Sequence, residues 1–254
     1  MPTYLPDTNV LIDYGGRVSS AKAKLDSAEA GGATFVLAPS MMTELTVGLV
    51  NRGATHFEHD RKMFEWLHAH SGGILELARP FMGKILGFPS KWSGVETSHF
   101  VQRLEMVVKS KTFDEFLKRK DTSSSVWKDI DQSGPVHKGK VDDEFTALEK
   151  FAAAPSGSFD LAAKFCKTFE NAGKCPEPEE FRKHFSAALE YVESCIEKIR
   201  RGAKPRKNNR GIYGDFQLLC YLGGPSITFL TSENFSDDIK HSPQRARIVG
   251  LDAL

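Results

Sequence analysis

The sequence predicts an α/β fold in which helices cover both faces of a parallel β-sheet. Short, continuous apolar segments near both chain ends have the length and composition of strands buried on both faces. Segments with helical patterns alternate with them, as in βαβ units. The long middle of the chain has helical patterns but no convincing strand. We therefore expect a discontinuous α/β core formed by residues 1–51 and 211–254, and an all-helical insertion over residues 52–210 that packs on this core.

The N-terminal part of the core contains two predicted strands. Residues 3–6 form the first, which we expect to end at Pro6 because proline cannot donate a backbone hydrogen bond to a neighbouring strand. The segment "SSAKAKLDSAEA", residues 19–30, predicts a helix with serine at its start and a glycine pair after its end. The segment "ATFVLAP", residues 33–39, predicts the second strand, and Ser40 can cap the helix that follows.

The C-terminal part returns to the same alternation. The segment "GDFQLLCYLGG", residues 214–224, predicts a helix. It is followed by "SITFLTSEN", residues 226–234, a predicted strand that runs into a polar turn, and by "ARIVGL", residues 246–251, a last strand. In the middle of the chain, the clearest helical patterns cover residues 95–120 and 176–202.

The composition limits the classes of protein to consider. With 40% hydrophobic residues the chain can build a sizeable core, and no apolar run approaches the roughly 20 residues that span a bilayer. Asp7 and Asp13 interrupt the apolar start of the chain, unlike a secretory signal. The four cysteines include no C-x-x-C pair, which favours reduced thiols over a disulfide framework or a zinc site. We therefore expect a cytoplasmic protein with no membrane contact.

Four acids lie next to predicted strands. Asp7 follows the first strand, and Glu44 lies in the helix that follows the second. Asp215 opens the helix before the strand at 226–234, and Glu233 lies in the turn after that strand. In an open parallel sheet, ligand sites gather beyond the carboxyl ends of the strands, so these four carboxylates could converge.

Each acid alone also has a structural explanation. Asp7 could cap the turn "TNVLID", and Asp215 could be a helix N-cap. Glu44 could favour the dipole of its helix, and Glu233 could be a solvated turn residue. The placement of all four together favours a site. Converging carboxylates repel one another, which raises some of their pKa values or requires cations. Mg²⁺, with its preference for oxygen ligands, is the obvious candidate for such a cation.

Four segments of the sequence resemble the successive motifs of the PIN-domain nuclease superfamily, especially its VapC-like toxin branch. The segments are "LPDTNVLIDY", "APSMMTELTVGL", "YGDFQLLCYL" and "ITFLTSEN". The first two match most specifically, with Asp-Thr-Asn after a strand and Thr-Glu-Leu followed by Gly. The resemblance covers residues 1–50 and 211–250 and does not extend to the helical middle.

The resemblance implies a PIN-like parallel sheet and a metal-dependent endoribonuclease that uses Mg²⁺ or Mn²⁺. A metal-activated water would hydrolyse phosphodiester bonds of single-stranded or structured RNA, leaving a 3′-hydroxyl and a 5′-phosphate. Asp7, Glu44 and Asp215 carry over as the principal catalytic and metal-binding acids. The fourth acid of the family is usually Asp, whereas the matching residue is Glu233, so Asp237 or Asp238 could take its place. The polar residues that match beside these acids are Asn9 and Thr231.

Positive charge is concentrated in one segment, although the formal net charge of the chain is only +1. Between Glu197 and Asp215 there are seven basic residues and no acid. The segment could be a helix C-terminus followed by a solvated loop. It could also bind RNA phosphates beside the acids, where charge contributes affinity without sequence choice. The predicted nucleic-acid-binding residues are Arg200, Arg201, Lys204, Arg206, Lys207 and Arg210.

Two other functions compete with the nuclease. A haloacid-dehalogenase-type phosphatase also has Asp after its first strand, but that chemistry requires a second Asp two residues later, where this chain has Asn9. A catalytically weak or inactive PIN-like protein that binds RNA or serves as a scaffold is the stronger alternative, and the Glu at position 233 would suit it. Beyond RNA, an antitoxin-like protein and a second copy of the chain are the partners that the resemblance leaves open.

Overall fold

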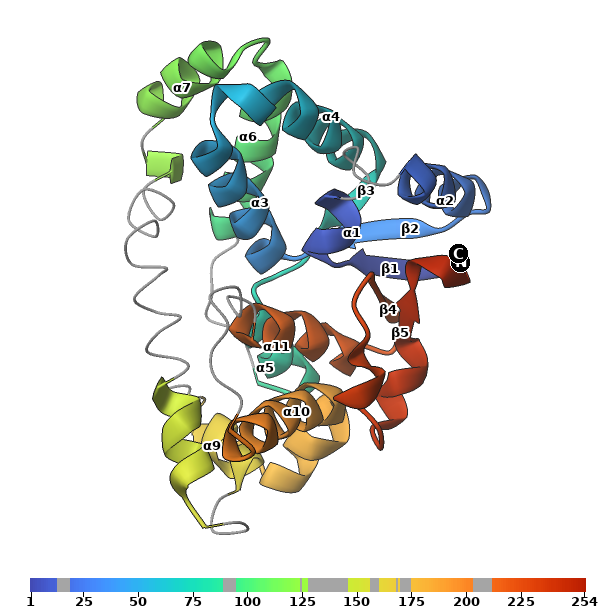
Figure 1. The fold of residues 1–254 in the computed structure, drawn as a ribbon, viewed down its shortest axis with the longest axis vertical. Coiled ribbons are helices and arrows are strands. Elements are labelled where there is room, and N and C mark those ends of the chain that lie inside the picture. Colours follow the sequence, from blue (N-terminus) through green and yellow to red (C-terminus); the bar gives the residue numbers. More distant parts are fainter. Residues whose placement is uncertain are drawn as a thin grey trace.

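The five strands of the sheet are all parallel and have the order β3-β2-β1-β4-β5. The computed structural model describes residues 1–12, 19–88, 95–123, 125–127, 146–155, 160–167, 169, 175–202 and 212–254. The strands are β1 (Thr3–Pro6), β2 (Thr34–Leu37), β3 (Ser71–Ile74), β4 (Ile227–Thr231) and β5 (Ile248–Gly250). Strand β1 is central, so its carboxyl end meets those of β2 and β4 at one edge of the sheet (Figure 1).

The α/β class and four of the strands confirm the sequence prediction. Strand β1 ends at Pro6, which pairs with Leu230 of β4. Pro6 is tolerated there because β1 pairs with β2 only through Thr3 and Tyr4, so the missing N–H removes no bond to β2. The helix after β2 begins two residues earlier than expected, with Ala38 instead of Ser40 at the N-cap position and Ser40 inside the first turn.

The prediction of an all-helical stretch over residues 52–210 is wrong at β3. This edge strand pairs with β2 in the registers Phe35 to Ser71 and Leu37 to Ile74, with an irregularity between them. Its sequence, Ser-Gly-Gly-Ile, contains a single apolar residue and therefore carries no strand pattern. Gly72 is needed because the strands approach closely: a Cβ atom at this position would lie 2.4 Å from Cγ2 of Thr34.

Two groups of helices lie on opposite sides of the sheet (Figure 1). One group contains α3 (Pro39–Arg52), α4 (Ala54–His70), α6 (Val95–Lys109) and α7 (Phe113–Thr122). The other contains α5 (Ala78–Ile85), α9 (Leu161–Lys167), α10 (Pro178–Arg200) and α11 (Ile212–Cys220). Helix α1 (Thr8–Ile12) follows β1 directly, and α2 (Ser19–Ala30) precedes β2. Residues 146–153 are also helical, and the 3₁₀ turns are η3 (Tyr221–Gly223), η4 (Phe235–Asp237), η5 (Pro243–Arg247) and η6 (Leu251–Ala253).

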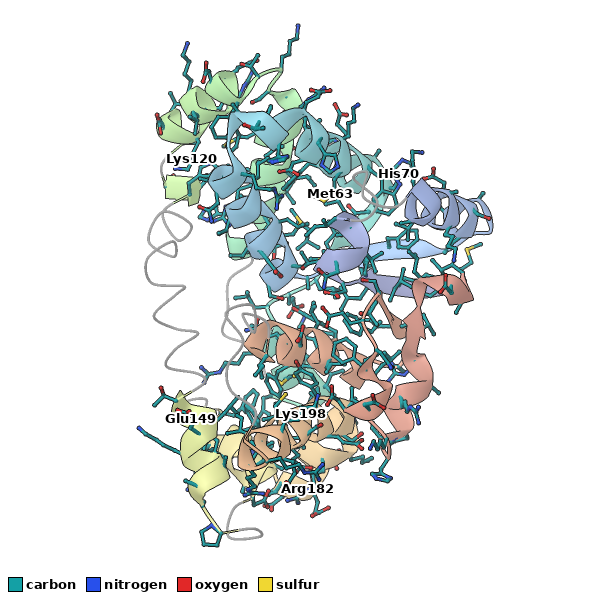
Figure 2. The ribbon with its side chains drawn as sticks, in the orientation of Figure 1. Met63, His70, Lys120, Glu149, Arg182 and Lys198 are labelled. Carbon is teal, nitrogen blue, oxygen red and sulfur yellow. The ribbon has the colours of Figure 1, made fainter. Side chains whose placement is uncertain are left out.

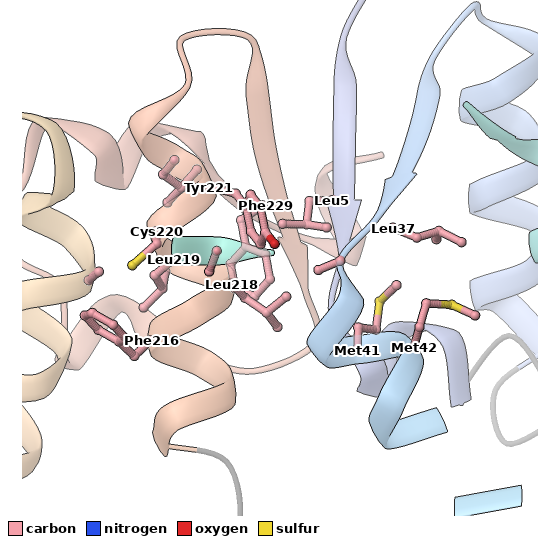
Figure 3. Packing of buried hydrophobic residues seen from close by; sticks show 14 of the residues in the cluster. Leu5, Leu37, Met41, Met42, Phe216, Leu218, Leu219, Cys220, Tyr221 and Phe229 are labelled. Carbon is pink, nitrogen blue, oxygen red and sulfur yellow. The ribbon is translucent and has the colours of Figure 1, made fainter. Parts of the chain in front are cut away.

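The hydrophobic core is one cluster that extends to both sides of the sheet. Figure 3 shows Phe216 and Leu219 of α11 on one side of Leu5 and Phe229, and Met42 of α3 on the other. Aromatic rings join the helices of the long middle segment to this core. Their packing holds α10 against α11, since the ring of Phe165 lies 4.5 Å from that of Phe216 and 5.9 Å from that of Phe181 (centroid distances).

No helix within the described part of the chain is both long enough and apolar enough to cross a membrane.

Candidate acidic site

Asp7 lies directly beyond the carboxyl end of β1 and is almost completely buried, with 4% of its surface exposed. Its backbone N–H donates to the carbonyl of Leu230, 2.7 Å away, which extends the pairing of β1 with β4. Its backbone carbonyl accepts a bond from Leu11, and its carboxylate accepts one from the backbone N–H of Thr8. Asp7 therefore starts α1, and the same geometry points its carboxylate into the edge of the sheet where β1 and β4 end.

Polar side chains connect Asp7 to Glu233, which is exposed in the turn after β4. Nδ2 of Asn9 donates to Oε1 of Glu233 at 2.5 Å and lies 3.5 Å from Oδ2 of Asp7. Oγ1 of the buried Thr231 donates to Oδ2 of Asp7 at 3.3 Å and accepts a bond from the backbone N–H of Glu233 at 3.0 Å. Asn9 and Thr231, both predicted from the sequence, thus bridge the ends of two adjacent strands.

Glu44 reaches the same edge from α3, the helix that follows β2. Its Oε2 accepts a hydrogen bond of 2.8 Å from Oγ1 of Thr8. Glu44 is exposed, whereas Thr8 is buried directly after Asp7. The bond therefore joins the second acid of the predicted set to the residue next to the first.

Asp215 completes the arrangement from the first turn of α11. A helix that leads into a parallel strand runs antiparallel to it, so the start of α11 lies at the edge where β4 ends. Asp215 is half-buried, and its Oδ2 accepts a hydrogen bond of 2.5 Å from the hydroxyl of Tyr191 on α10.

The four acids influence one another's charge. Burial, followed by the negative charges of Glu233 and Glu44, raises the pKa of Asp7 to about 7, although bonds from Thr8 and Thr231 oppose the shift. Burial also raises the pKa of Asp215 to about 7. The hydrogen bond from Tyr191 opposes this shift, and the charges of Asp7, Glu233 and Glu44 add to it. The four predicted acids are thus close enough for the charge of one to shift the pKa of another.

The described residues contain no group of three His, Cys, Asp or Glu side chains placed to hold a metal ion. The acids are close enough to shift one another's pKa values, but like charges repel, and each carboxylate is bonded to a neutral donor instead. The chemistry of the set still suits a hard divalent cation. Carboxylate oxygens are the ligands that Mg²⁺ and Mn²⁺ prefer, and a cation would lower the two raised pKa values.

The two other acids considered for the fourth position differ from Glu233. Asp237 is exposed in η4. Asp238 is occupied by α10, because its Oδ1 lies 2.6 Å from Oγ of Ser194 and 2.5 Å from Nζ of Lys198. Glu233 is therefore the acid of the turn that is joined to Asp7, through Asn9.

The predicted basic strip is described only at its start. Arg201 is exposed at the end of α10. Arg200 has a structural role, because its guanidinium donates to backbone carbonyls at the end of the 146–153 helix, at residues Phe151, Ala152 and Ala154, and pairs with Glu197. Lys204, Arg206, Lys207 and Arg210 lie outside the described residues. Their binding to nucleic acid remains a prediction.

Sequence reasoning missed two residues of the site. Thr8 lies inside the motif Asp-Thr-Asn, and its position between two predicted site residues could have identified it. Tyr191 lies in the middle of a long helical pattern, far from Asp215 in the sequence, and no local signal distinguishes it from the core residues around it.

Comparisons with protein-family models, with curated proteins and with solved structures found no match for this chain.

Proposed function

We propose that the protein is a metal-dependent endoribonuclease. One observation carries the proposal: hydrogen bonds through Thr8, Asn9 and Thr231 join acids from three elements where β1 and β4 end. Burial and the charges of Glu44 and Glu233 raise the pKa values of Asp7 and Asp215 there to about 7. Buried acids with strongly raised pKa values cluster at functional sites, because holding them there costs stability that a purely structural role does not repay. The resemblance of the four motifs to PIN-domain nucleases supports RNA as the substrate.

The residues that would hold Mg²⁺ or Mn²⁺ are Asp7, Glu44, Asp215 and Glu233. A bound divalent cation would make a water molecule more acidic and neutralise charge that develops on the phosphate. The chain's own residues supply position: Thr231 and Asn9 orient the carboxylates of Asp7 and Glu233.

The experiment measures cleavage of a labelled single-stranded RNA by the purified protein with Mn²⁺, with Mg²⁺ and with EDTA. We expect cleavage with either metal, and none with EDTA or after Asp215→Asn. Asp237→Asn is the control, because it makes the same chemical change at an exposed acid of η4, after β4. Cleavage that persists in EDTA, or in the Asp215→Asn variant, would contradict the proposal.

The RNA-binding part of the proposal has its own test. Reversal of Arg206, Lys207 and Arg210 to Glu should weaken RNA binding strongly, with little change in thermal stability. Loss of three phosphate contacts would also lower the salt slope of single-strand binding by about 2, at roughly 0.7 per contact. Unchanged affinity and salt slope would reduce the segment to a solvated loop.

A second candidate is an RNA-binding or scaffold protein without catalytic activity. It is favoured by one observation: the described acids are bonded to neutral donors and no three of them form a metal-binding group. This candidate predicts RNA binding that does not respond to millimolar Mn²⁺ or Mg²⁺ and no cleavage with either metal. The nuclease candidate predicts cleavage that depends on Mn²⁺ or Mg²⁺.

A further inference from the structure

Helix α10 belongs to the long middle segment, yet one of its faces is bonded to the chain that follows β4. The carboxylate of Glu190 accepts hydrogen bonds from the backbone N–H groups of residues 240, 241 and 242, at 2.7, 2.8 and 2.8 Å. Ser194 and Lys198, one and two turns further along the helix, both bind Asp238. Figure 2 shows Lys198 on this helix. The face therefore controls the position of the segment that carries Glu233 and Asp238.

Tyr191 lies on the same face, next to Glu190, and its ring is held rigidly. The side chain is 7% exposed. Its ring centroid is 5.5 Å from that of Phe235 in η4, and Phe235 in turn contacts Phe229 of β4 at 5.7 Å. An aromatic side chain has only two torsions, so this packing leaves its hydroxyl little freedom. The hydroxyl is directed at Oδ2 of Asp215, 2.5 Å away.

A tyrosine hydroxyl suits this position for chemical reasons. The phenol of a tyrosine ordinarily loses its proton only near a pH of about 10, so it is a neutral donor at physiological pH. A neutral donor orients the carboxylate without adding a positive charge that would compete with a cation. A carboxylate has two oxygens, and a bond to one leaves the other available as a ligand. Partners of this kind orient metal-binding side chains in proteins generally.

Helix α10 binds Asp238 through groups of a different kind from the one that binds Asp215. Asp238 is bound by a hydroxyl, from Ser194, and by an ammonium group, from Lys198. The positive charge of Lys198 already neutralises this carboxylate, so a cation would have to compete with Lys198 for it. Among the described residues, the group that orients Asp215 is the neutral hydroxyl of Tyr191.

We propose that Tyr191 is a positioning residue of the acidic site: its hydroxyl binds one carboxylate oxygen of Asp215 and leaves the other available to a divalent cation, while the ammonium group of Lys198 on the same helix neutralises Asp238. The inference rests on the proposed function insofar as the site binds a metal. It does not depend on the RNA. Under this proposal the long middle segment contributes directly to the site, because residues of α10 determine which acids can act as metal ligands.

The test compares two tyrosines that each donate one hydrogen bond from a buried ring. Tyr191→Phe keeps the ring that packs on Phe235 and removes the bond to Asp215. Tyr221→Phe is the matched control, because the hydroxyl of the buried Tyr221 donates to the backbone carbonyl of Glu76, away from the four acids. Mn²⁺ binding is measured by calorimetry, and thermal unfolding of both variants in EDTA measures the structural cost.

We expect Tyr191→Phe to weaken Mn²⁺ binding by about 10-fold, the lower end of the effect of losing a partner of a metal ligand. Tyr221→Phe should bind Mn²⁺ like the wild type even if it is equally destabilised. In RNA cleavage, Tyr191→Phe should raise the Mn²⁺ concentration for half-maximal rate and recover much of the rate at saturation. A variant that is only less stable would not need more Mn²⁺ for half-maximal rate while keeping much of its rate at saturating Mn²⁺.

Equal Mn²⁺ affinity of Tyr191→Phe and the wild type would overturn the positioning role, as would equal weakening by Tyr221→Phe. A wild-type protein that binds Mn²⁺ but leaves RNA intact would contradict the proposed function alone, and the comparison of the two tyrosines would still stand. A wild-type protein that binds no Mn²⁺ would overturn both.

Discussion

Asp7 and Asp60 are both almost completely buried, with 4% and 5% of their surfaces exposed, but the charges around them differ. The carboxylate of Asp60 on α4 lies 2.8 Å from Nη2 of Arg52 and accepts a second bond of 2.9 Å from Nε. The carboxylate of Asp7 is bonded to neutral groups, and the charges of the described residues that shift its pKa are those of Glu233 and Glu44, both negative.

The difference separates a structural acid from a candidate functional one. A buried carboxylate is costly unless a positive charge or several hydrogen bonds compensate it. Arg52, eight residues before Asp60, provides that compensation within the fold. At Asp7 the fold adds Glu44 and Glu233 instead, which raises the cost further. A site that accumulates negative charge in this way is suited to bind a cation.

The largest expected effect is on catalysis. Asp7→Asn keeps the shape of the side chain and removes its charge. We expect it to reduce metal-dependent RNA cleavage by more than about 100-fold. Loss of a residue that only hydrogen-bonds to a metal ligand costs up to about 100-fold, and loss of the ligand itself should cost more. Its free energy of unfolding at pH 8 should equal or exceed that of the wild type, because a buried charge is removed. Cleavage at saturating Mn²⁺ and denaturant unfolding measure the two effects.

Full cleavage by Asp7→Asn would remove Asp7 from the mechanism. Loss of the fold in this variant would instead give Asp7 the structural role that Asp60 has.

Asp60→Ala should show the opposite pattern, with reduced stability and unchanged metal binding. Breaking a buried ion pair costs about 3–5 kcal/mol, and the 31% exposure of the Arg52 side chain reduces this to roughly 2–3 kcal/mol. Denaturant unfolding measures the loss, and calorimetry measures the Mn²⁺ affinity. Glu58→Ala, which removes an exposed acid of the same helix, serves as the control. A weaker Mn²⁺ affinity in Asp60→Ala would break the comparison, since both acids would then act on the site.

The contribution of Asp7 and Asp215 to stability in EDTA should fall as the pH rises from about 4 to about 7. Between the ordinary value of 3.8 and the folded-state pKa of about 7, Asp7 and Asp215 are ionised in the unfolded chain but protonated in the folded one. The folded state therefore binds more protons, and rising pH favours unfolding by at most roughly 1.4 kcal/mol per pH unit for each acid. Above pH 7 both states are ionised and the loss is complete.

Denaturant unfolding at several pH values measures this dependence. Asp7→Asn should flatten it, because one of the two titrating groups is gone, and Mn²⁺ should restore stability most above pH 7. An identical pH dependence of stability in Asp7→Asn and the wild type would mean that Asp7 is compensated as Asp60 is.

The smallest effect is expected at Glu233, the exposed member of the set. Glu233→Gln should raise the Mn²⁺ concentration needed for half-maximal cleavage, with much of the rate recovered at high Mn²⁺, because it removes one ligand charge of the site. Asp237→Asn and Asp238→Asn should have smaller effects, since one is exposed and the other is bound to Lys198. A larger effect of either would show that the fourth acid has been assigned to the wrong residue of this turn.

The sequence by itself determined the α/β class, the strands β1, β2, β4 and β5, and the positions of Asp7 and Glu233 after β1 and β4. These features are local, because an apolar run of four or five residues followed by an acid can be recognised without its neighbours. The short glycine-containing strand β3 has no such run, and pairing with β2 defines it as a strand.

Only the tertiary structure decided how the acids are joined. Asn9 and Glu233 are 224 positions apart in the chain, and Tyr191 and Asp215 are 24 apart, on two different helices. The tertiary structure also decided that Asp238 is bound by Ser194 and Lys198. It likewise decided that Arg200 donates a hydrogen bond to a carbonyl at the end of the 146–153 helix. The physical reason is that a charged or polar side chain takes its partner from whatever packing brings within about 3 Å. A local pattern does not report that distance.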